Sequence, residues 1–384
     1  MRTGEAASPI PVPSIDLGAQ LREVETDVRA AIDRVLASQR FILGPEGEAL
    51  EEEVARYAGC AHAVGLSSGT DALLVGLMAL GVGPGDEVIT TPYTFVATVS
   101  PIARLGARAV FVDIEHKTYT LDPAGLTAAI TPRTRAIVPV HLFGQMADMR
   151  AIHAIADPRG IPVLEDAAQA LGATRDAEPI GRGSQGATLS FFPTKNLGAM
   201  GDGGMLLTDD EAFAKRVRLL RNHGQETKYV SALLGGNFRL DELQAAILRA
   251  KLPYLDGWIA RRQDNARRYR EAFAAADTRS MWHFELPYEV PGARHVYHQL
   301  VVRTPTQVPL REHLATRGIT TSVYYPQPMH LAPCFASWGY KVGDFDGAEC
   351  ACHETLALPV HPELPAASLQ RVVDEIVSLL RDRP

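Results

Sequence analysis

Lysine 195 lies among apolar side chains in the segment Ser190–Gly198, and the glycine-rich turn Gly201–Gly204 follows it. Burial among apolar groups disfavours the charged ammonium form of a lysine, which frees the neutral amine. A neutral amine is a nucleophile that can hold an aldehyde as a Schiff base. An ordinary surface lysine in a glycine-rich loop fits this segment equally well, so residues elsewhere must decide between the two readings.

A candidate anion site lies in the segment Val64–Leu74, which reads as a strand, a tight loop and a helix. Its small loop residues let a ligand approach the backbone, and the free N–H groups of Gly69, Thr70 and Asp71 at the helix start attract an anion such as phosphate. The alternative is that Ser68 or Thr70 only caps the helix.

A candidate carboxylate, Asp166, follows the apolar strand Ile161–Leu164. Open α/β sheets bind ligands at the carboxyl ends of their strands, and a carboxylate survives there only with a cationic or hydrogen-bonding partner. A protonated pyridine nitrogen is such a partner, and Gln169 could donate to a phenolic oxygen on the same ring. Alternatively, Asp166 only caps the following helix.

Together, a phosphate clamp, a strand-end carboxylate and an amine are the groups that pyridoxal phosphate requires. The phosphate site at Gly69 comes first in the chain, Asp166 follows, and Lys195 comes third. Ser190 could add a hydroxyl to the phosphate. The order and the chemistry of the three segments therefore predict a pyridoxal phosphate site.

These segments resemble the DegT/DnrJ/EryC1/StrS sugar aminotransferases, a family of fold-type-I pyridoxal phosphate enzymes. The resemblance runs from Phe41 to Pro359. Six segments carry it: Ser68–Leu73, Gly83–Val88, Thr94–Thr98, Glu165–Gln169, Ser190–Lys195 and Asn237–Ala246.

The resemblance implies a role for each matching residue. Lys195 is the Schiff-base lysine and Asp166 the pyridinium partner. The other cofactor contacts implied are Phe95 against the ring, Gln169 near the phenolic oxygen, Gly69, Thr70 and Ser190 on the phosphate, and Asn237 on the phosphate of a neighbouring subunit. The last contact implies a homodimer with shared active sites.

The implied activity is transfer of the amino group of glutamate to the keto group of a TDP- or UDP-linked keto-deoxysugar, in two half-reactions through pyridoxamine phosphate. Related dehydratases carry histidine at the position of Lys195, so the lysine indicates transamination. Two alternatives stay open: an aminotransferase for a keto-inositol, and a regulator that binds the cofactor or a sugar nucleotide without catalysis.

Three residues are candidate substrate contacts: Arg239, Tyr325 and His330. Relatives often read His-Tyr-Pro where this chain has Tyr324-Tyr325-Pro326, which leaves the acceptor open. Arg239 is a candidate for a substrate carboxylate, and a salt bridge between subunits is the alternative. Lone histidines at buried strand ends are more often core residues, so His141, His223 and His298 receive no catalytic role.

The elements that must position these residues form an α/β fold of the fold-type-I class. Short apolar runs between Ala63 and Leu207 predict strands buried on both faces, in a mostly parallel mixed sheet covered by helices. Amphipathic helices are expected over Leu17–Gln39 and from Pro45 toward Tyr57. We expect a large cofactor-binding domain over residues 1–252 and a smaller α+β domain over 253–384, with strands at His298–Val302 and Thr320–Tyr324.

Composition limits the partners. The 384 residues carry a net charge of −7 without a basic block, which predicts no binding to nucleic acid or an anionic membrane. The four cysteines lack the spacing of a zinc site or the density of a disulfide scaffold, so no metal is expected. Met1–Pro13 shows no apolar leader and no apolar run reaches the ~20 residues of a membrane span, so a cytoplasmic protein is expected.

Overall fold

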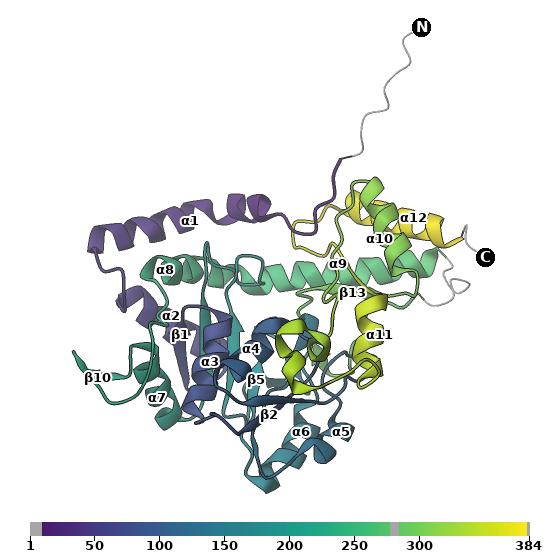
Figure 1. Cartoon of the computed structure of the whole chain (residues 1–384). Helices are drawn as coiled ribbons and strands as arrows, with labels where there is room; N and C mark the ends of the chain where they lie inside the picture. Colours follow the sequence, from purple (N-terminus) through teal and green to yellow (C-terminus); the bar gives the residue numbers. More distant parts are fainter. Residues whose placement is uncertain (1–9, 277–283, 382–384) are drawn as a thin grey trace.

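A seven-stranded mixed sheet forms the centre of the structure, a computed structural model that describes residues 10–276 and 284–381 (Figure 1). The strands of this sheet, in chain order, are β1 (His62–Leu66), β2 (Glu87–Thr90), β3 (Arg108–Phe111), β4 (Thr134–Ile137), β5 (Leu164–Asp166), β8 (Gly186–Ser190) and β9 (Gly204–Thr208). The order across the sheet is β3-β2-β4-β5-β8-β9-β1. Among these seven strands, β9 runs in the opposite direction to the other six.

The junction between β4 and β5 consists of two isolated parallel bridges, Ile137 with Val163 and Val140 with Asp166. Pro139 and Pro162 stand at this junction and have no N–H to donate, so the ladder cannot be continuous there. Both apolar runs are therefore shorter as strands than the sequence suggests. The mixed, mostly parallel sheet itself was predicted correctly.

Both faces of the sheet are buried, because successive residues of each strand point to opposite faces. Ala63, Ile89, Ile137 and Leu207 belong to the core on one face. Val64, Val88, Ala136 and Leu206, each beside one of those residues in the chain, belong to the core on the other face. This alternation is the reason for continuous apolarity along the strands.

Two sets of helices cover the two faces. The first face packs against α2 (Pro45–Ala58), α5 (Pro123–Ala129), α6 (Met149–Ala156), α8 (Glu242–Lys251) and the start of α9 (Leu255–Ala275). The second face packs against α3 (Gly69–Ala79), α4 (Val96–Arg104) and α7 (Glu211–Arg221). The first helix, α1 (Leu17–Ser38), lies outside this layer and contacts α8 and α9 through Val24, Val28 and Trp258.

A third core joins the C-terminal part of the chain. The elements around it are the second half of α9, β13 (Leu300–Arg303), α10 (Gln307–Thr316), β14 (Thr355–Leu358) and α12 (Ala366–Arg381). Val12 from the N-terminal segment also belongs to it and forms a bridge with Ile319. The division at residues 252 and 253 stays a prediction, and Val12 crosses it.

The remaining elements connect these layers or edge them. They are β6 (Thr174–Arg175), β7 (Glu178–Pro179) and β12 (Ala293–Arg294) in one small sheet, the hairpin β10 (Gln225–Thr227) and β11 (Val230–Ser231), α11 (Asp346–Glu354), and short 3₁₀ turns at 142–144, 157–159, 252–254, 329–331 and 333–338. The strand expected at Thr320–Tyr324 was wrong: Ser322 makes only a single bridge, with Ala357. No helix in the described ranges is both long and apolar enough to cross a membrane.

A buried carboxylate ties α2 to α8. Glu242, the first residue of α8, is 1% exposed and accepts hydrogen bonds from the N–H groups of Gly44, Glu46 and Gly47 at 2.8, 2.8 and 3.0 Å. Those N–H groups begin α2 and have no partner within the helix, so the carboxylate serves as its cap. A side chain at Gly44 or Gly47 would meet this carboxylate within 2.7 Å.

We predict that Glu242→Ala lowers the free energy of unfolding by about 3 kcal/mol, because three buried donors lose a charged acceptor. Glu242→Gln, which keeps one acceptor oxygen, should lose less. The measurement is urea unfolding at fixed protein concentration, with exposed Glu52→Ala as the control. Equal midpoints for Glu242→Ala and Glu52→Ala would contradict the assignment.

Candidate active site

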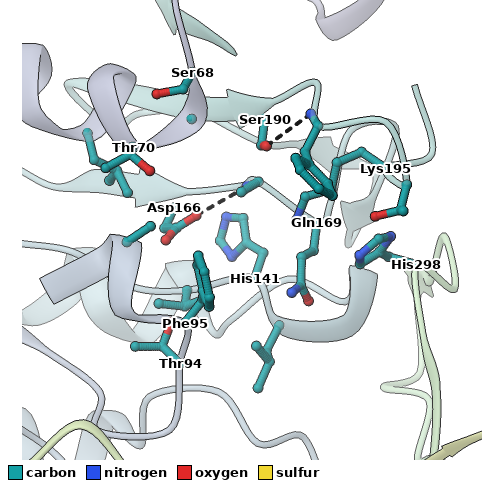
Figure 2. A pocket seen from close by; sticks show the side chains of 18 of the residues that line it. Ser68, Thr70, Thr94, Phe95, His141, Asp166, Gln169, Ser190, Lys195 and His298 are labelled. Atoms are coloured by element: carbon teal, nitrogen blue, oxygen red, sulfur yellow. Dashed lines mark hydrogen bonds between the residues drawn. The ribbon is translucent and has the colours of Figure 1, made fainter. Parts of the chain in front are cut away.

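A cavity of about 320 Å³ lies at the carboxyl edge of the sheet, where β1, β2, β5 and β8 end. Eight of the residues predicted from the sequence line it: Gly69, Thr70, Phe95, Asp166, Gln169, Ser190, Lys195 and Tyr325. All but Tyr325 lie at the ends of these four strands or in the segments that follow them, and Figure 2 shows most of the eight around the same space. Three predicted residues, Asn237, Arg239 and His330, are not among its lining residues.

Lys195 sits in the loop between β8 and β9, and its N–H donates to the carbonyl of Phe192 at 2.8 Å. Burial lowers the pKa of the Lys195 amine to about 8, and the negative charge of Asp166 partly opposes this shift. A larger fraction of the amine is therefore neutral near neutral pH than for an ordinary lysine, although the protonated form still predominates below pH 8. This is the property that the sequence analysis required of a nucleophilic lysine.

Asp166 is the last residue of β5 and is 6% exposed. Its Oδ2 accepts from the Thr98 hydroxyl at 2.7 Å and its Oδ1 accepts from the Ala168 N–H at 3.2 Å. Thr98 in turn shares a hydrogen bond with Thr94 at 2.7 Å. These contacts hold the carboxylate in place, and a buried carboxylate with two donors can still bind a cation.

Gln169 is oriented by two contacts. Its Oε1 accepts from the Phe143 N–H at 2.6 Å, so its Nε2 faces the other way and donates to the Tyr325 hydroxyl at 3.1 Å. The sequence predicted donation to a phenolic oxygen of a bound ring; the structure shows donation to the phenolic oxygen of a tyrosine. Burial, with the charge of Asp166, raises the pKa of Tyr325, so this phenol stays neutral.

The start of α3 forms the opposite wall of the cavity. The Ser68 hydroxyl caps this helix by accepting from the Asp71 N–H at 3.0 Å, which leaves the N–H groups of Gly69 and Thr70 in the uncapped first turn. A side chain at Gly69 would come within 2.7 Å of the Ser190 Cβ, so only glycine lets the helix approach β8 this closely. The Ser190 hydroxyl therefore lies beside the two free N–H groups.

Two aromatic rings border the same space. The Phe95 ring, 53% exposed, lies just before α4, and its centre is 5.7 Å from that of Tyr325. The exposed Phe95 ring lines the cavity, so a ligand bound there could cover it. Tyr324 and Tyr325 add further aromatic wall on the side of the C-terminal part of the chain.

Asn237 and Arg239 line a second cavity, of about 500 Å³, which shares Ser68 and Asp202 with the first. Arg239 donates to the Asn222 side-chain oxygen at 2.9 Å, while its Nε is buried without a partner among the described residues. Within one chain, the structure does not bring these two residues to Lys195.

His330 is 2% exposed and packs among the rings of Phe111, Tyr340 and Phe345. Its Nε2 is 3.0 Å from a carboxylate oxygen of Glu349. The structure therefore places it in an aromatic core and not among the residues that line the cavity. Its predicted contact with a substrate is not supported by this position.

The sequence analysis assigned no role to three residues that the structure brings to the site: His141 and His298 line the cavity, and Thr98 donates to Asp166. Thr98 lies in the first turn of α4 and Thr94 lies two residues before that helix, so their hydrogen bond forms at the helix start and no helical spacing marks it. His141 lines the cavity, but its Nδ1 accepts from the Ala147 N–H and its Nε2 is 2.8 Å from Glu165, so both nitrogens have protein partners. His298 also lines the cavity, and nothing in the local sequence marks it.

The donor set fits a phosphorylated, ring-bearing aldehyde cofactor. Two free helix N–H groups and a hydroxyl suit a phosphate, a fixed carboxylate suits a ring cation, and an amine of lowered pKa suits an aldehyde. The strand order and this site define an α/β enzyme of the fold-type-I pyridoxal phosphate class. Residues 22–377 match the sequence model of the DegT/DnrJ/EryC1/StrS aminotransferase family, and the chain belongs to that family.

Three relatives are similar over almost their whole length. A "pleiotropic regulatory protein" of Geobacillus stearothermophilus is 48% identical, over 96% of this chain and 99% of its own. A dTDP-3-amino-3,4,6-trideoxy-alpha-D-glucose transaminase of Streptomyces venezuelae is 44% identical over 95% of each chain. A UDP-N-acetyl-3-dehydro-alpha-D-glucosamine 3-aminotransferase of Acidithiobacillus ferrooxidans is 41% identical over 95% of this chain and 97% of its own.

Two solved structures share the fold. DesV of S. venezuelae, in complex with a ketimine intermediate, is 43% identical with a TM-score of 0.94, over 97% of this chain and 99% of its own. NtdA of Bacillus subtilis, with bound cofactor PMP, is 30% identical with a TM-score of 0.90, over 99% of this chain and 87% of its own.

We predict that Lys195→Met stabilises the cofactor-free protein most at low pH. The folded chain holds this amine with a pKa of about 8 against an ordinary 10.5, so below pH 8 it carries the full cost of a buried charge. Between these values the unfolded chain binds more protons, and wild-type stability rises with pH. The advantage of methionine should therefore be largest below about pH 8, and its pH-dependent part should fall to zero as the pH rises past 10.5.

The measurement is the difference in urea midpoint between the two proteins across this pH range. A variant that is no more stable than wild type at low pH would show that the amine is not desolvated.

Proposed function

We propose that this chain is a pyridoxal phosphate-dependent aminotransferase that moves the amino group of glutamate to the keto group of a nucleotide-linked keto-sugar. The observation that carries the proposal is the pairing of Lys195 and Asp166 in one cavity, an amine whose pKa is lowered to about 8 opposite a buried carboxylate. A binding protein has no need of such an amine, whereas amino transfer depends on it.

The residues that would hold the cofactor divide by chemistry. Gly69, Thr70 and Ser190 would bind its phosphate, Asp166 its ring nitrogen, and Lys195 its aldehyde. When bound, pyridoxal phosphate supplies an electron sink for carbanion chemistry at the substrate carbon. Asp166, fixed by Thr98 and the Ala168 N–H, would keep the ring nitrogen protonated.

Lys195 serves as the proton carrier once its amine is free. An amine with a pKa of about 8 can take the Cα proton of glutamate near neutral pH and return a proton to the product carbon. The neighbouring Asp166 stabilises the ammonium form, so the amine can cycle between its two states. One residue therefore works in both half-reactions.

The acceptor is proposed from the relatives. Those of S. venezuelae and A. ferrooxidans are named as transaminases of dTDP- and UDP-linked sugars. The phenol and phenyl rings of Phe95, Tyr324 and Tyr325 give this cavity an apolar wall with polar edges, which suits a sugar ring.

A regulatory role is the second candidate, because the Geobacillus relative is named as a regulatory protein. That name and catalysis do not exclude each other. Lys195, Asp166 and Ser190 all stand in this chain at the cavity, and a regulator that only binds would not require the lysine. Turnover therefore decides between the two.

We also propose that two copies complete the site. Asn237 and Arg239 lie in the second cavity beside Ser68, and Ile42 on its rim is 45% exposed. Phe41, Leu43 and Met200 are also at least 37% exposed. Exposed apolar side chains of this size favour burial by another protein surface, and here a second copy would bring its Asn237 toward the phosphate site.

We predict that the purified enzyme releases 2-oxoglutarate from glutamate in the presence of a TDP- or UDP-linked keto-sugar. The measurement is 2-oxoglutarate release over a panel of nucleotide keto-sugars and a keto-inositol. Lys195→Ala should bind free cofactor and release none. Release of 2-oxoglutarate with the keto-inositol alone would overturn the proposal that the acceptor is a nucleotide-linked sugar. No release with any acceptor, although the cofactor is bound, would favour the regulatory role.

We predict that hybrid dimers of Lys195→Ala and Asn237→Asp chains recover activity. Each parent homodimer has two damaged sites, because aspartate at 237 would repel the phosphate. A hybrid has one site with a native Lys195 and a native Asn237 if the two come from different chains. Activity of isolated hybrids that does not exceed that of either parent would show that both residues serve the same chain's site.

A further inference from the structure

His298 lies just before β13, in the C-terminal part of the chain, and is 6% exposed. It lines the same cavity as Lys195, and Figure 2 shows its ring beside that lysine. The sequence analysis assigns it no catalytic role, and the proposed mechanism does not use it. A buried imidazole at the cavity wall therefore needs an explanation.

Asn196, the residue after Lys195, sets the orientation of this imidazole. The Asn196 Nδ2 donates to the carbonyl of Val296 at 3.0 Å, and a carbonyl can only accept, so the Asn196 Oδ1 faces the other way. That Oδ1 lies 3.3 Å from the His298 Nδ1. Because Oδ1 is an acceptor, Nδ1 must carry the proton, and a neutral ring then leaves Nε2 unprotonated.

The surroundings of His298 keep the ring neutral. Burial, followed by the positive charges of Lys195 and Arg262, lowers the pKa of His298 well below its ordinary value. Arg262, 3% exposed in α9, donates to the backbone carbonyls of Tyr297 and His298 at 3.2 and 3.3 Å. These bonds fix the backbone, while Asn196 fixes the ring.

The Nε2 of His298 has no hydrogen-bond partner among the residues that the structure describes, in contrast to His141, whose two nitrogens are both occupied. This Nε2 is not fully buried, and because His298 lines the cavity, the exposed part of the ring nitrogen faces the cavity. An open, unprotonated nitrogen in a buried wall can bind only a hydrogen-bond donor.

We propose that the His298 Nε2 accepts a hydrogen bond from a ring hydroxyl of the acceptor sugar, and so selects acceptors that carry this hydroxyl. The proposal rests on the proposed function and deepens it. A sugar hydroxyl is a neutral donor of the right chemistry. Glutamate is not, because its carboxylates only accept and its amine is the reacting group.

A site built around a hydroxyl rejects the analogue that lacks it, because the buried acceptor is then left unpaired. His298 is therefore a specificity residue for the second half-reaction. The first half-reaction, with glutamate, should be indifferent to it.

The first experiment compares wild type, His298→Phe and His298→Gln in the two half-reactions, followed separately in single turnovers by cofactor absorbance. Phenylalanine keeps an aromatic ring without an acceptor, and glutamine retains an acceptor oxygen. We expect His298→Phe to lose about 10- to 100-fold in kcat/KM for the keto-sugar and His298→Gln to lose less. The glutamate half-reaction should change less than about twofold.

Monodeoxy acceptors, each lacking one ring hydroxyl, provide the matched control. Wild type should lose about 10- to 100-fold with one of them, and His298→Phe should not discriminate between that analogue and the parent sugar. An equal loss in both half-reactions, or continued discrimination by His298→Phe, would overturn the proposal and leave a structural role for the ring.

The second experiment reads the ring directly, independently of turnover. In ¹⁵N-histidine NMR of the holoenzyme, the signals missing from His298→Phe identify His298. We expect an unprotonated Nε2 at neutral pH, whose resonance moves when a nucleotide keto-sugar is added. A protonated Nε2, or a resonance that does not move when the sugar is added, would overturn the proposal even if transamination were found. If transamination were not found, the proposed function would fail, and the NMR measurement would still show whether His298 contacts the sugar.

Discussion

The site depends on one electrostatic arrangement: a buried amine, Lys195, shares its cavity with a buried carboxylate, Asp166. Burial disfavours the charged form of an amine and so lowers its pKa. Thr98 and the Ala168 N–H donate to Asp166, and the negative charge of Asp166 opposes part of the fall in the pKa of Lys195. The carboxyl edge of a sheet with both faces covered provides this environment. The apolar cores on both faces exclude water from the strands, and the helix that starts at this edge presents backbone N–H donors to the cavity.

Close contacts between helices, strands and loops hold the elements that line this edge in place. Glycine at position 69 lets α3 approach Ser190, and Glu242 holds the start of α2 against α8. At the other end of α8, the buried Lys251 donates to the carbonyl of Gly198, three residues after Lys195. The loop that carries Lys195 is thus held from β8, from β9 and from α8, which limits how far its amine can move.

Much of this could be predicted from the sequence, for identifiable reasons. Continuous apolar runs predict a sheet covered on both faces, because burial on both faces requires an apolar side chain at every position of a strand. Gly69, Asp166, Ser190 and Lys195 could be placed in one cavity because each follows a strand, and strand ends meet. What could not be predicted depends on contacts between distant segments. Gln169 meets Tyr325, His298 meets Asn196, and the His330 ring turns into an aromatic core, with no local signal for any of them.

The cavity has two origins in the chain. The groups for amine chemistry come from residues 68–195, whereas Tyr324, Tyr325 and His298 enter from the C-terminal third. Two hydrogen bonds between side chains cross that seam at the cavity, Gln169 with Tyr325 and Asn196 with His298, and the Asn196 side chain also donates to the Val296 carbonyl. Recombination that exchanges the C-terminal thirds of two relatives could therefore change the preferred sugar and keep the amine chemistry. The recipient N-terminal part would need a glutamine at the position of Gln169 and an asparagine at the position of Asn196 to form these two hydrogen bonds.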